Sequence, residues 1–321
     1  MNNSNLQAAK RTKNDEFYTR IEDIEAEINH YKTQLNGKTI YCNCDNPEAS
    51  MFWKYFHDHF KDIGLKELRA TYKTQDGHPS YLTVYDGIRD HRHKLDGDGA
   101  FQSHECYLIM QLSDIIITNP PFSQFRAFID MLVSNEKSFL IIGNQNAAGY
   151  KKIFPLIKNG KLWPGYSFNK TMEFIMPDDY ELKGNAFIDD EGKKHGFVPG
   201  IAWFTNMDIP KRHISLIDTL QKSYEMHPEN YPRYDNYDAI NVDRTKDIPY
   251  DYNGKMGVPI TFLDKFNPDE FEIIDINPHF FTLVAEGKEK PKQLTLKNVG
   301  KKDPYSRILI KRKELYTDED Y

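Results

Sequence analysis

Apolar residues form two patterns in the first two thirds of the chain, and each pattern predicts one kind of element. Over residues 20–35 they repeat every three or four positions, which predicts an amphipathic helix. A second helix is expected to begin at Asn46 as the N-cap, with Pro47 in the first helical position, and to run to about Lys61. Further helices are predicted over 106–112, 123–133 and 150–158.

Between these helices lie short runs that are almost entirely apolar, which is the pattern of strands buried on both faces. The expected strands span 38–42, 65–72, 81–85, 113–118, 138–142, 161–163, 172–176 and 201–205, with a loop rich in Gly, Asp and His over 86–99. The alternation of such strands with helices predicts an α/β protein with a doubly wound, mainly parallel sheet.

The pattern changes after about Asp208. Residues 208–321 are rich in Tyr, Asp and Pro without a clear period, which predicts an irregular, aromatic-rich region with one strand candidate over 307–310. Residues 1–13 are polar and mildly basic and lack the apolar segment of a secretory signal, so a flexible arm is expected there. The sequence thus divides into an arm, a domain over 14–207 and a separate C-terminal region.

Composition narrows the class of protein. The 321-residue chain has a net charge of −6 and a mean hydropathy of −0.70, and no stretch approaches the ~20 apolar residues of a membrane span. Cys42, Cys44 and Cys106 are too few for a disulfide framework and form no paired metal-ligand motif, so we expect no metal and a reduced, cytoplasmic setting. The negative charge argues mildly against nucleic acid as a partner, but local basic clusters such as 307–313 leave it open.

The most informative feature is Asn119-Pro120-Pro121-Phe122, which directly follows the apolar strand 113–118. The side-chain carbonyl of Asn119 and the main-chain carbonyl of Pro120 can both accept hydrogen bonds from one –NH2 group, and the fixed proline φ helps to pre-set their geometry. Phe122 can stack on the flat ring that carries the amine. The corner favours chemistry on a planar amine by orientation and preorganised dipoles, whereas an isolated Asn-Pro-Pro is more often an ordinary turn.

Two other polar turns are expected at the same edge of the sheet, because ligands of open parallel sheets bind outside the carboxyl ends of the strands. One spans 43–47 after the first strand, and the other spans 96–101, before the helix that leads into the central strand. Residues 14–19 precede the first strand and are equally consistent with a capped helix start or with one wall of a cofactor pocket.

These segments in this order resemble the amino-directed methyltransferases that use S-adenosylmethionine, in the gamma arrangement of the DNA adenine methyltransferases. A closer resemblance, over about residues 13–313, is to the EcoRI-type adenine methyltransferases. Five segments carry it: DEFYT (15–19), YCNCD (41–45), TNPPFS (118–123), YDNYD (234–238) and GKMGVPITFL (254–263).

The resemblance implies a Rossmann-like class I fold that transfers a methyl group from S-adenosylmethionine to the N6 amino group of an adenine flipped out of duplex DNA. Asn119, Pro120, Pro121 and Phe122 are then the catalytic residues. The implied cofactor contacts are Phe17, Tyr18, Thr19, Asn43, Cys44, Asp45, Asp98 and Phe101. Residues 14–207 become the cofactor-binding catalytic domain and 208–321 the target-recognition region.

Contacts with the target base and DNA are assigned by the same resemblance. Phe174 occupies the place of a second aromatic that such enzymes present to the base. Arg233, Asn236 and Arg244 are candidates for reading purine edges, although solvation at the surface is the commoner role for any one of them. Double-stranded DNA is the implied partner, together with a restriction endonuclease that acts on the same site without forming a stable complex. A monomer in a bacterial or phage-type cytoplasm, associated with DNA and not with membrane, is expected.

The sequence departs from the wider methyltransferase pattern at two places, and two alternative functions stay open. The first turn, 43–47, contains no glycine, an oddity shared by the EcoRI-type pattern, and Ala100 replaces the second Asp of the family loop, which leaves Asp96 or Asp98 to contact the cofactor adenine. The Asn119 corner alone cannot separate a DNA base from an RNA base or a protein Gln. A catalytically silent DNA-binding module is the alternative from a different class.

Overall fold

The computed structural model describes residues 18–74, 78–176, 182, 184, 186–289 and 293–313. Two compact units make up the chain: residues 1–146 with 164–207, and residues 147–163 with 208–321. Residues 147–163, expected within the first domain, therefore pack with the C-terminal region. The predicted arm over 1–13 lies outside the described residues.

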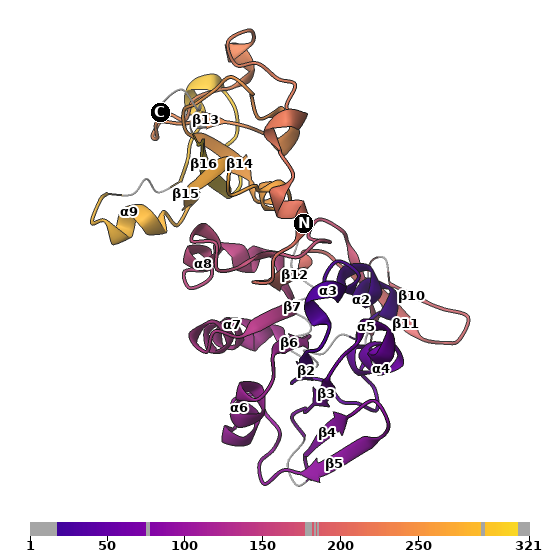
Figure 1. The fold of residues 1–321 in the computed structure, drawn as a ribbon. Helices are drawn as coiled ribbons and strands as arrows, with labels where there is room; N and C mark the ends of the chain where they lie inside the picture. Colours follow the sequence, from indigo (N-terminus) through magenta and orange to yellow (C-terminus); the bar gives the residue numbers. More distant parts are fainter. Residues whose placement is uncertain are drawn as a thin grey trace, which may run out of the picture. The chain divides into compact units, whose positions relative to one another are not determined.

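The first unit contains a large mixed sheet with a parallel centre (Figure 1). Its strand order is β5 (Asp90–Lys94), β4 (Tyr81–Tyr85), β3 (Glu67–Ala70), β2 (Thr39–Cys42), β6 (Ile115–Thr118), β7 (Ser138–Asn144), β12 (Ile201–Thr205) and β8 (Trp163–Pro164). β3, β2, β6 and β7 run parallel, whereas β4, β5 and β12 pair antiparallel with their neighbours. The predicted α/β class is confirmed, with a sheet that is mixed and parallel at its centre.

Helices cover both faces of this sheet (Figure 1). On one side lie α2 (Ile21–Ile28), α3 (Lys32–Leu35), α4 (Met51–Asp58) and α5 (Phe60–Ile63), and on the other α6 (His104–Gln111) and α7 (Phe125–Ser134). The helix predicted over 20–35 is thus interrupted between α2 and α3. Among the described residues, no helix combines the length and apolarity that a bilayer crossing requires.

The start of α4 differs from the prediction. Ser50, not Asn46, is its N-cap, because the Ser50 side chain accepts hydrogen bonds from the backbone N–H groups of Phe52 (3.1 Å) and Trp53 (3.4 Å). Asn46 instead closes a turn in which its carbonyl accepts from Ala49 and Ser50. The Asn-Pro pair therefore belongs to the loop between β2 and α4.

A smaller antiparallel sheet also belongs to the first unit. It has the order β1 (Tyr18–Thr19), β9 (Met172–Met176), β11 (Lys194–Val198) and β10 (Phe187–Ile188). The predicted strand 172–176 is confirmed in its bounds, but it lies in this sheet and pairs with the segment that contains Thr19.

The second unit contains a third sheet where an irregular region was expected. Its order is β13 (Ile240–Asn241), β14 (Met256–Pro259), β16 (Arg307–Arg312) and β15 (Phe271–Asn277), and its helices are α8 (Phe154–Lys158) and α9 (Phe281–Ala285). Short 3-10 helices complete the chain: η1 (Phe122–Gln124), η2 (Gln145–Gly149), η3 (Pro210–His213), η4 (Ile217–Thr219), η5 (Pro228–Asn230), η6 (Thr245–Asp247), η7 (Ile260–Lys265) and η8 (Lys297–Val299). The single predicted strand over 307–310 is the core of β16.

The carboxylate of Glu27 is fully buried in the first unit and holds α2 to the segment after β8. It accepts hydrogen bonds from the hydroxyl of Tyr31 (2.9 Å) and from the backbone N–H groups of Tyr166 (2.6 Å) and Ser167 (2.8 Å). A buried carboxylate is tolerated only when such donors replace water. This residue is therefore a structural element of the core.

Replacing Glu27 with Ala removes the acceptor of all three donors. We expect the free energy of unfolding to fall by about 3–5 kcal/mol, because buried donors that lose their acceptor retain their desolvation cost. Denaturant titration monitored by circular dichroism measures it. Glu25→Ala, at an exposed position of the same helix, is the matched control and should change stability little. Equal stability of the two variants would contradict the role of Glu27.

Candidate functional site

The site lies where two neighbouring parallel strands end. After β2 the chain passes through α4 and α5 to β3 on one side of β2, and it later returns to β6 on the other side. This reversal is a topological switch point, where open α/β sheets bind their ligands beyond the carboxyl ends of the strands. Asn43 follows β2 and Asn119 follows β6, so both polar turns reach this edge.

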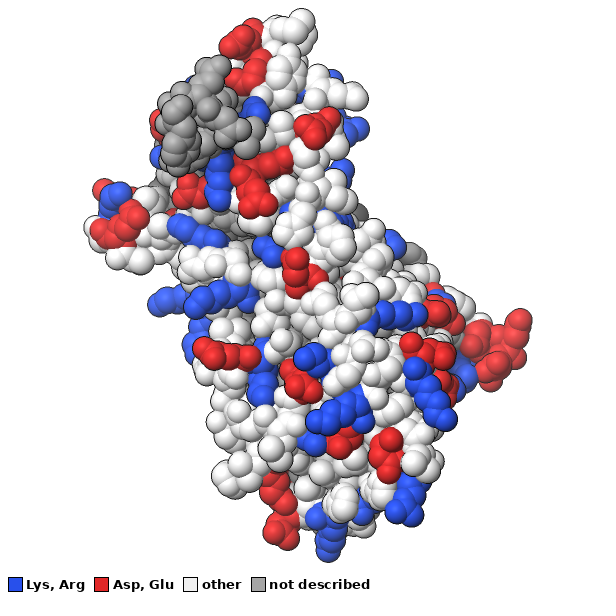
Figure 2. All heavy atoms as spheres, viewed as in Figure 1, with Lys and Arg blue, Asp and Glu red and all other residues white. Residues whose placement is uncertain are grey.

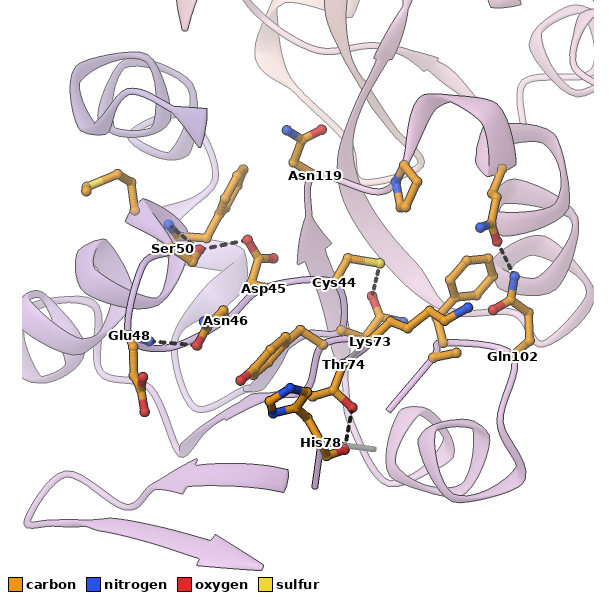
Figure 3. A pocket seen from close by; sticks show the side chains of 18 of the residues that line it. Cys44, Asp45, Asn46, Glu48, Ser50, Lys73, Thr74, His78, Gln102 and Asn119 are labelled. Atoms are coloured by element: carbon orange, nitrogen blue, oxygen red, sulfur yellow. Dashed lines mark hydrogen bonds between the residues drawn. The ribbon is translucent and has the colours of Figure 1, made fainter. Parts of the chain in front are cut away.

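A cavity of about 580 Å³ opens at this edge (Figure 3). Residues of both strand-end turns line it together with residues from β1, α4, the segment after β3 and the 96–101 loop. The lining comprises Thr19, Asn43, Cys44, Asp45, Asn46, Glu48, Ser50, Met51, Phe52, Tyr72, Lys73, Thr74, His78, Pro79, Arg92, Ala100, Phe101, Gln102, Asn119, Pro121 and Gln124.

Seven of the fifteen predicted site residues that the structure describes line this cavity. Those that line it are Thr19, Asn43, Cys44, Asp45, Phe101, Asn119 and Pro121. Pro120 is buried and Phe122 is half-buried at the start of η1, and neither lines the cavity. Tyr18 lies in β1 beside Thr19, and Phe17 lies outside the described residues.

Asp98 and Phe174 also lie away from the cavity wall. Asp98 is exposed, where its carboxylate accepts from the backbone N–H of Ala100 (3.0 Å) and pairs with Lys73 at 3.8 Å. It therefore shapes the loop that carries Ala100 and Phe101 to the cavity. Phe174 is fully buried in β9, opposite Thr19 in the strand pairing. Its ring is not on a surface that a base can reach without rearrangement.

Sequence reasoning missed the wall formed after β3. Tyr72, Lys73 and Thr74 line the cavity, but the strand was predicted to continue to residue 72. β3 ends at Ala70, so these three residues already belong to the loop that follows the strand at the carboxyl edge. The shared edge of the parallel strands was the signal that could have identified them.

The carboxylate of Asp45 connects the separate parts of the site. One oxygen accepts a hydrogen bond from the Ser50 hydroxyl (2.7 Å), and the other accepts from the Thr118 hydroxyl (2.5 Å). The backbone N–H of Asp45 donates to the carbonyl of Thr71, directly after β3 (3.1 Å). The first bond is visible beside the cavity in Figure 3. Asp45 therefore joins the ends of β2, β3 and β6 to the start of α4.

The hydroxyl oxygen of Thr19 and the side-chain nitrogen of Asn43 are buried at the cavity and have no hydrogen-bond partner among the described residues. Thr19 is 3% exposed and Asn43 is 1% exposed. Buried polar groups are nearly always paired with protein, water or a ligand. The cavity thus offers a hydroxyl and an amide donor to a polar ligand.

The outer wall carries charges of both signs. Arg92 pairs with Glu48 at 3.3 Å, and the guanidinium of Arg92 lies over the ring of Tyr81 at 4.4 Å.

The two cysteines near the cavity differ in their surroundings. In β2, burial raises the pKa of the Cys42 thiol well above its usual value, so this thiol stays protonated. Cys44, in contrast, is half-buried and lines the cavity.

The three residues predicted to read purine edges lie in the second unit, and the two arginines among them are in local ion pairs. Arg233 pairs with Asp238 (2.5 Å) and Arg244 with Asp247 (2.7 Å), and both arginine side chains are more than half exposed. Asn236 is different, because its amide nitrogen donates to the carbonyl of Gln293 (2.5 Å) and its amide oxygen accepts from the N–H of Thr295 (3.1 Å). Its amide is used within the unit.

Comparison with known proteins gives a consistent result. Residues 5–313 match the family described as adenine-specific methyltransferase EcoRI. The chain is 42% identical to Type II methyltransferase M.EcoRI of Escherichia coli over 98% of both chains. It is 40% identical to Type II methyltransferase M.MgeORF184P of Mycoplasma genitalium over 96% of this chain and 98% of that protein. It is 39% identical to Type II methyltransferase M.MpnI of Mycoplasma pneumoniae over 95% and 97%, respectively. No solved structure matches the chain.

Gly99 controls the loop that brings Ala100 and Phe101 to the cavity. Its φ is +74°, and a Cβ atom there would lie 2.3 Å from the carbonyl oxygen of Tyr72. We expect Gly99→Ala to lower the free energy of unfolding by about 2 kcal/mol or more, because both the backbone conformation and the space exclude a side chain.

Thermal and denaturant unfolding measure the effect, with two controls. Gly200→Ala tests the backbone term alone, since Gly200 has φ +79° and open space around it, and Gly97→Ala tests a nearby position without positive φ. The prediction fails if Gly99→Ala is no more destabilising than Gly97→Ala.

Proposed function

The chain belongs to the EcoRI-type family of adenine-specific DNA methyltransferases, and we propose that the cavity at the ends of β2 and β6 is where it transfers the methyl group. It is a site-specific DNA methyltransferase of a Type II restriction-modification system. The observation that carries the proposal is the position of Asn119. It follows β6 and lines the same cavity as the Asn43–Asp45 turn that follows β2.

S-adenosylmethionine is the proposed cofactor, and when bound it supplies an electrophilic methyl group on a sulfonium centre. A cofactor with a carboxylate, an ammonium, ribose hydroxyls and an adenine requires a cavity with several polar groups. The buried hydroxyl of Thr19 and the buried amide nitrogen of Asn43 suit such a ligand, as does a volume of about 580 Å³. We propose Thr19, Asn43, Cys44 and Phe101 as its contacts, together with Tyr72, Lys73 and Thr74.

Phe17 and Tyr18 remain proposed cofactor contacts from the family resemblance. Asp98 is proposed to act through the loop it shapes, because its exposed carboxylate caps the N–H of Ala100.

The assignment of a Rossmann-like class I fold rests on the parallel centre of the sheet, its switch point between β2 and β6, and the helices on both faces.

Asn119 is proposed to orient the N6 amino group of the target adenine. Its side-chain carbonyl and the main-chain carbonyl of Pro120 would each accept a hydrogen bond from one N–H of the amine, which leaves the nitrogen lone pair directed toward the methyl group. Transfer would form an N–C bond at the amine while the methyl–sulfur bond breaks, and the amine would then release a proton to solvent. Preorganised acceptors in a rigid turn supply most of the advantage, since they need no reorganisation. Phe122, half-buried beside them, is the proposed stacking partner of the flipped base.

The second unit is the proposed target-recognition region. Its exposed arginines, Arg233 and Arg244, can exchange their carboxylate partners for purine edges or phosphates. The amide of Asn236 already holds residues 293–295, so we assign it to the support of this unit. On the face shown in Figure 2, Lys and Arg are interspersed with Asp and Glu, so the net charge of −6 does not describe the local surface that DNA would meet.

Several wider properties complete the proposal. The three relatives are bacterial proteins, and we propose that this enzyme acts in the bacterial cytoplasm on chromosomal DNA. It is proposed to work as a monomer. A restriction endonuclease that cuts the same sequence is proposed to share its site and to form no stable complex with it.

Asn119→Ala should abolish methyl transfer, because the amine loses its side-chain acceptor, while cofactor affinity changes less than about threefold. The experiment incubates wild type and variant with labelled S-adenosylmethionine and unmethylated genomic DNA, and maps N6-methyladenine by sequencing. Calorimetry measures cofactor binding, and Asn159→Ala, at an exposed position in the other unit, is the control. Full activity of Asn119→Ala would show that the corner is only a turn.

Arg233→Ala and Arg244→Ala test target recognition once the methylated sequence is mapped. A base contact is worth about 1–3 kcal/mol, so a variant that loses one should bind its cognate duplex about 5- to 150-fold more weakly and discriminate less against a mismatched one. Fluorescence anisotropy at two salt concentrations separates this from a phosphate contact, which weakens binding to all sequences alike and reduces the salt slope.

Lys54→Ala removes a comparably exposed ion-paired cation from α4 and serves as the control. If neither arginine variant differs from it, the assignment of these two residues to DNA contact is wrong.

A further inference from the structure

The link between Asp45 and Thr118 crosses a place where backbone pairing has ended. β2 and β6 pair in parallel at Ile40 with Ile115 and at Tyr41 with Ile116. Thr118 lies two residues beyond this ladder, and on its other side it pairs with Ile141 of β7. At the carboxyl edge, the hydroxyl–carboxylate bond therefore continues the connection from β6 to the turn after β2.

The bond is well placed to fix geometry. Thr118 is fully buried and Asp45 is 7% exposed, and a hydroxyl that donates to a carboxylate forms one of the stronger and shorter hydrogen bonds in proteins. Threonine also has few side-chain rotamers because its Cβ is branched. A displacement of Thr118 relative to Asp45 therefore requires movement of the backbone.

We propose that Asp45 is a positioning residue. Through the hydroxyl of Thr118, it sets the placement of Asn119 relative to the Asn43–Asp45 turn, which is the proposed cofactor-binding turn. This inference rests on the proposed role of Asn119. The peptide bond joins Thr118 directly to Asn119, and the next two residues are prolines whose φ angles are fixed. The turn over residues 119–121 therefore has few free backbone torsions, so a displacement of Thr118 also displaces Asn119.

The other carboxylate oxygen of Asp45, which does not bond to Thr118, connects this residue to α4. It accepts from Ser50, whose own oxygen caps α4. Asp45 is thus held by a helix terminus on one side and holds the amine-binding turn on the other. The carboxylate acts through Thr118 on the orientation of the amine, and it does not itself contact the reacting atoms.

The distinguishing variants are Thr118→Val and Thr118→Ser. Valine keeps the shape and removes the hydroxyl, whereas serine keeps the hydroxyl. Because an error of about 1 Å in a reacting group costs up to about 100-fold in rate, we expect Thr118→Val to lower kcat by about 10- to 100-fold. The Kd for S-adenosylmethionine and the Kd for DNA should change less than about threefold. Thr118→Ser should stay within about threefold of the wild-type kcat.

Thr71→Val is the matched control. Thr71 is equally buried and follows β3, which lies on the opposite side of β2 from β6, and its hydroxyl bonds to Tyr41 at 2.6 Å. A general loss of stability should affect both valine variants alike, so unfolding temperature is measured for each. The inference is overturned if Thr118→Val keeps kcat within threefold, or if Thr71→Val lowers kcat as much. If Thr118→Val does not fold, Thr118→Cys, a weaker donor of similar size, takes its place with the same expected direction.

A double-mutant cycle tests whether the two residues act as one link. Asp45→Asn and Asp45→Asn/Thr118→Val should have similar kcat values, since the second change removes a link already weakened by the first. Independent effects that multiply would overturn the inference. Asn119→Ala is assayed in parallel: an active Asn119→Ala variant would refute the proposed role of Asn119, whereas an inactive one beside a fully active Thr118→Val would refute only the positioning role.

Discussion

The carboxylate of Asp45 is the interaction on which the site depends. It brings the first turn of the sheet, the end of the central strand and the start of α4 to one point through Thr118 and Ser50, and its backbone adds the end of β3. Burying a carboxylate is costly unless its oxygens find donors. Here the donors are two hydroxyl groups on other elements, so the same bonds that compensate for its burial also align those elements around the cavity.

The elements predicted best are those whose signal is local. The strands at 39–42, 115–118 and 138–144 carry continuous apolar runs, and Asn119 could be placed at the end of one of them because a strand and a rigid turn are both visible in the sequence. Asp45 and Asn43 followed from the rule that parallel strands share one carboxyl edge. Much of the candidate site could therefore be predicted from the amino-acid sequence.

Most elements that the sequence did not predict depend on contacts between residues distant in the chain. Met256-Gly257-Val258-Pro259 has the composition of a turn, yet it forms β14, where a Cβ on Gly257 would lie 2.2 Å from the hydroxyl of Tyr234. β15 contains an irregularity between Ile273 and Asp275 that breaks its alternation. In the same way, the burial of Phe174 depends on strand pairing with Thr19, a residue distant in sequence, which no local pattern records. The Ser50 cap is a local feature that binds the backbone N–H groups of Phe52 and Trp53, and the start of α4 was predicted wrongly because Asn46-Pro47 matches the same capping pattern.

The inclusion of residues 147–163 in the second unit has a consequence for how such enzymes can be rebuilt. The chain passes from one unit to the other at residues 146/147, at 163/164 and at 207/208. A single cut near residue 207 would leave α8 behind, including Lys158, whose ammonium group donates to the carbonyl of Ile274 and the hydroxyl of Thr282. A chimaera that exchanges sequence specificity between relatives must therefore graft two segments together, and natural recombination at one breakpoint would separate α8 from the sheet it packs on.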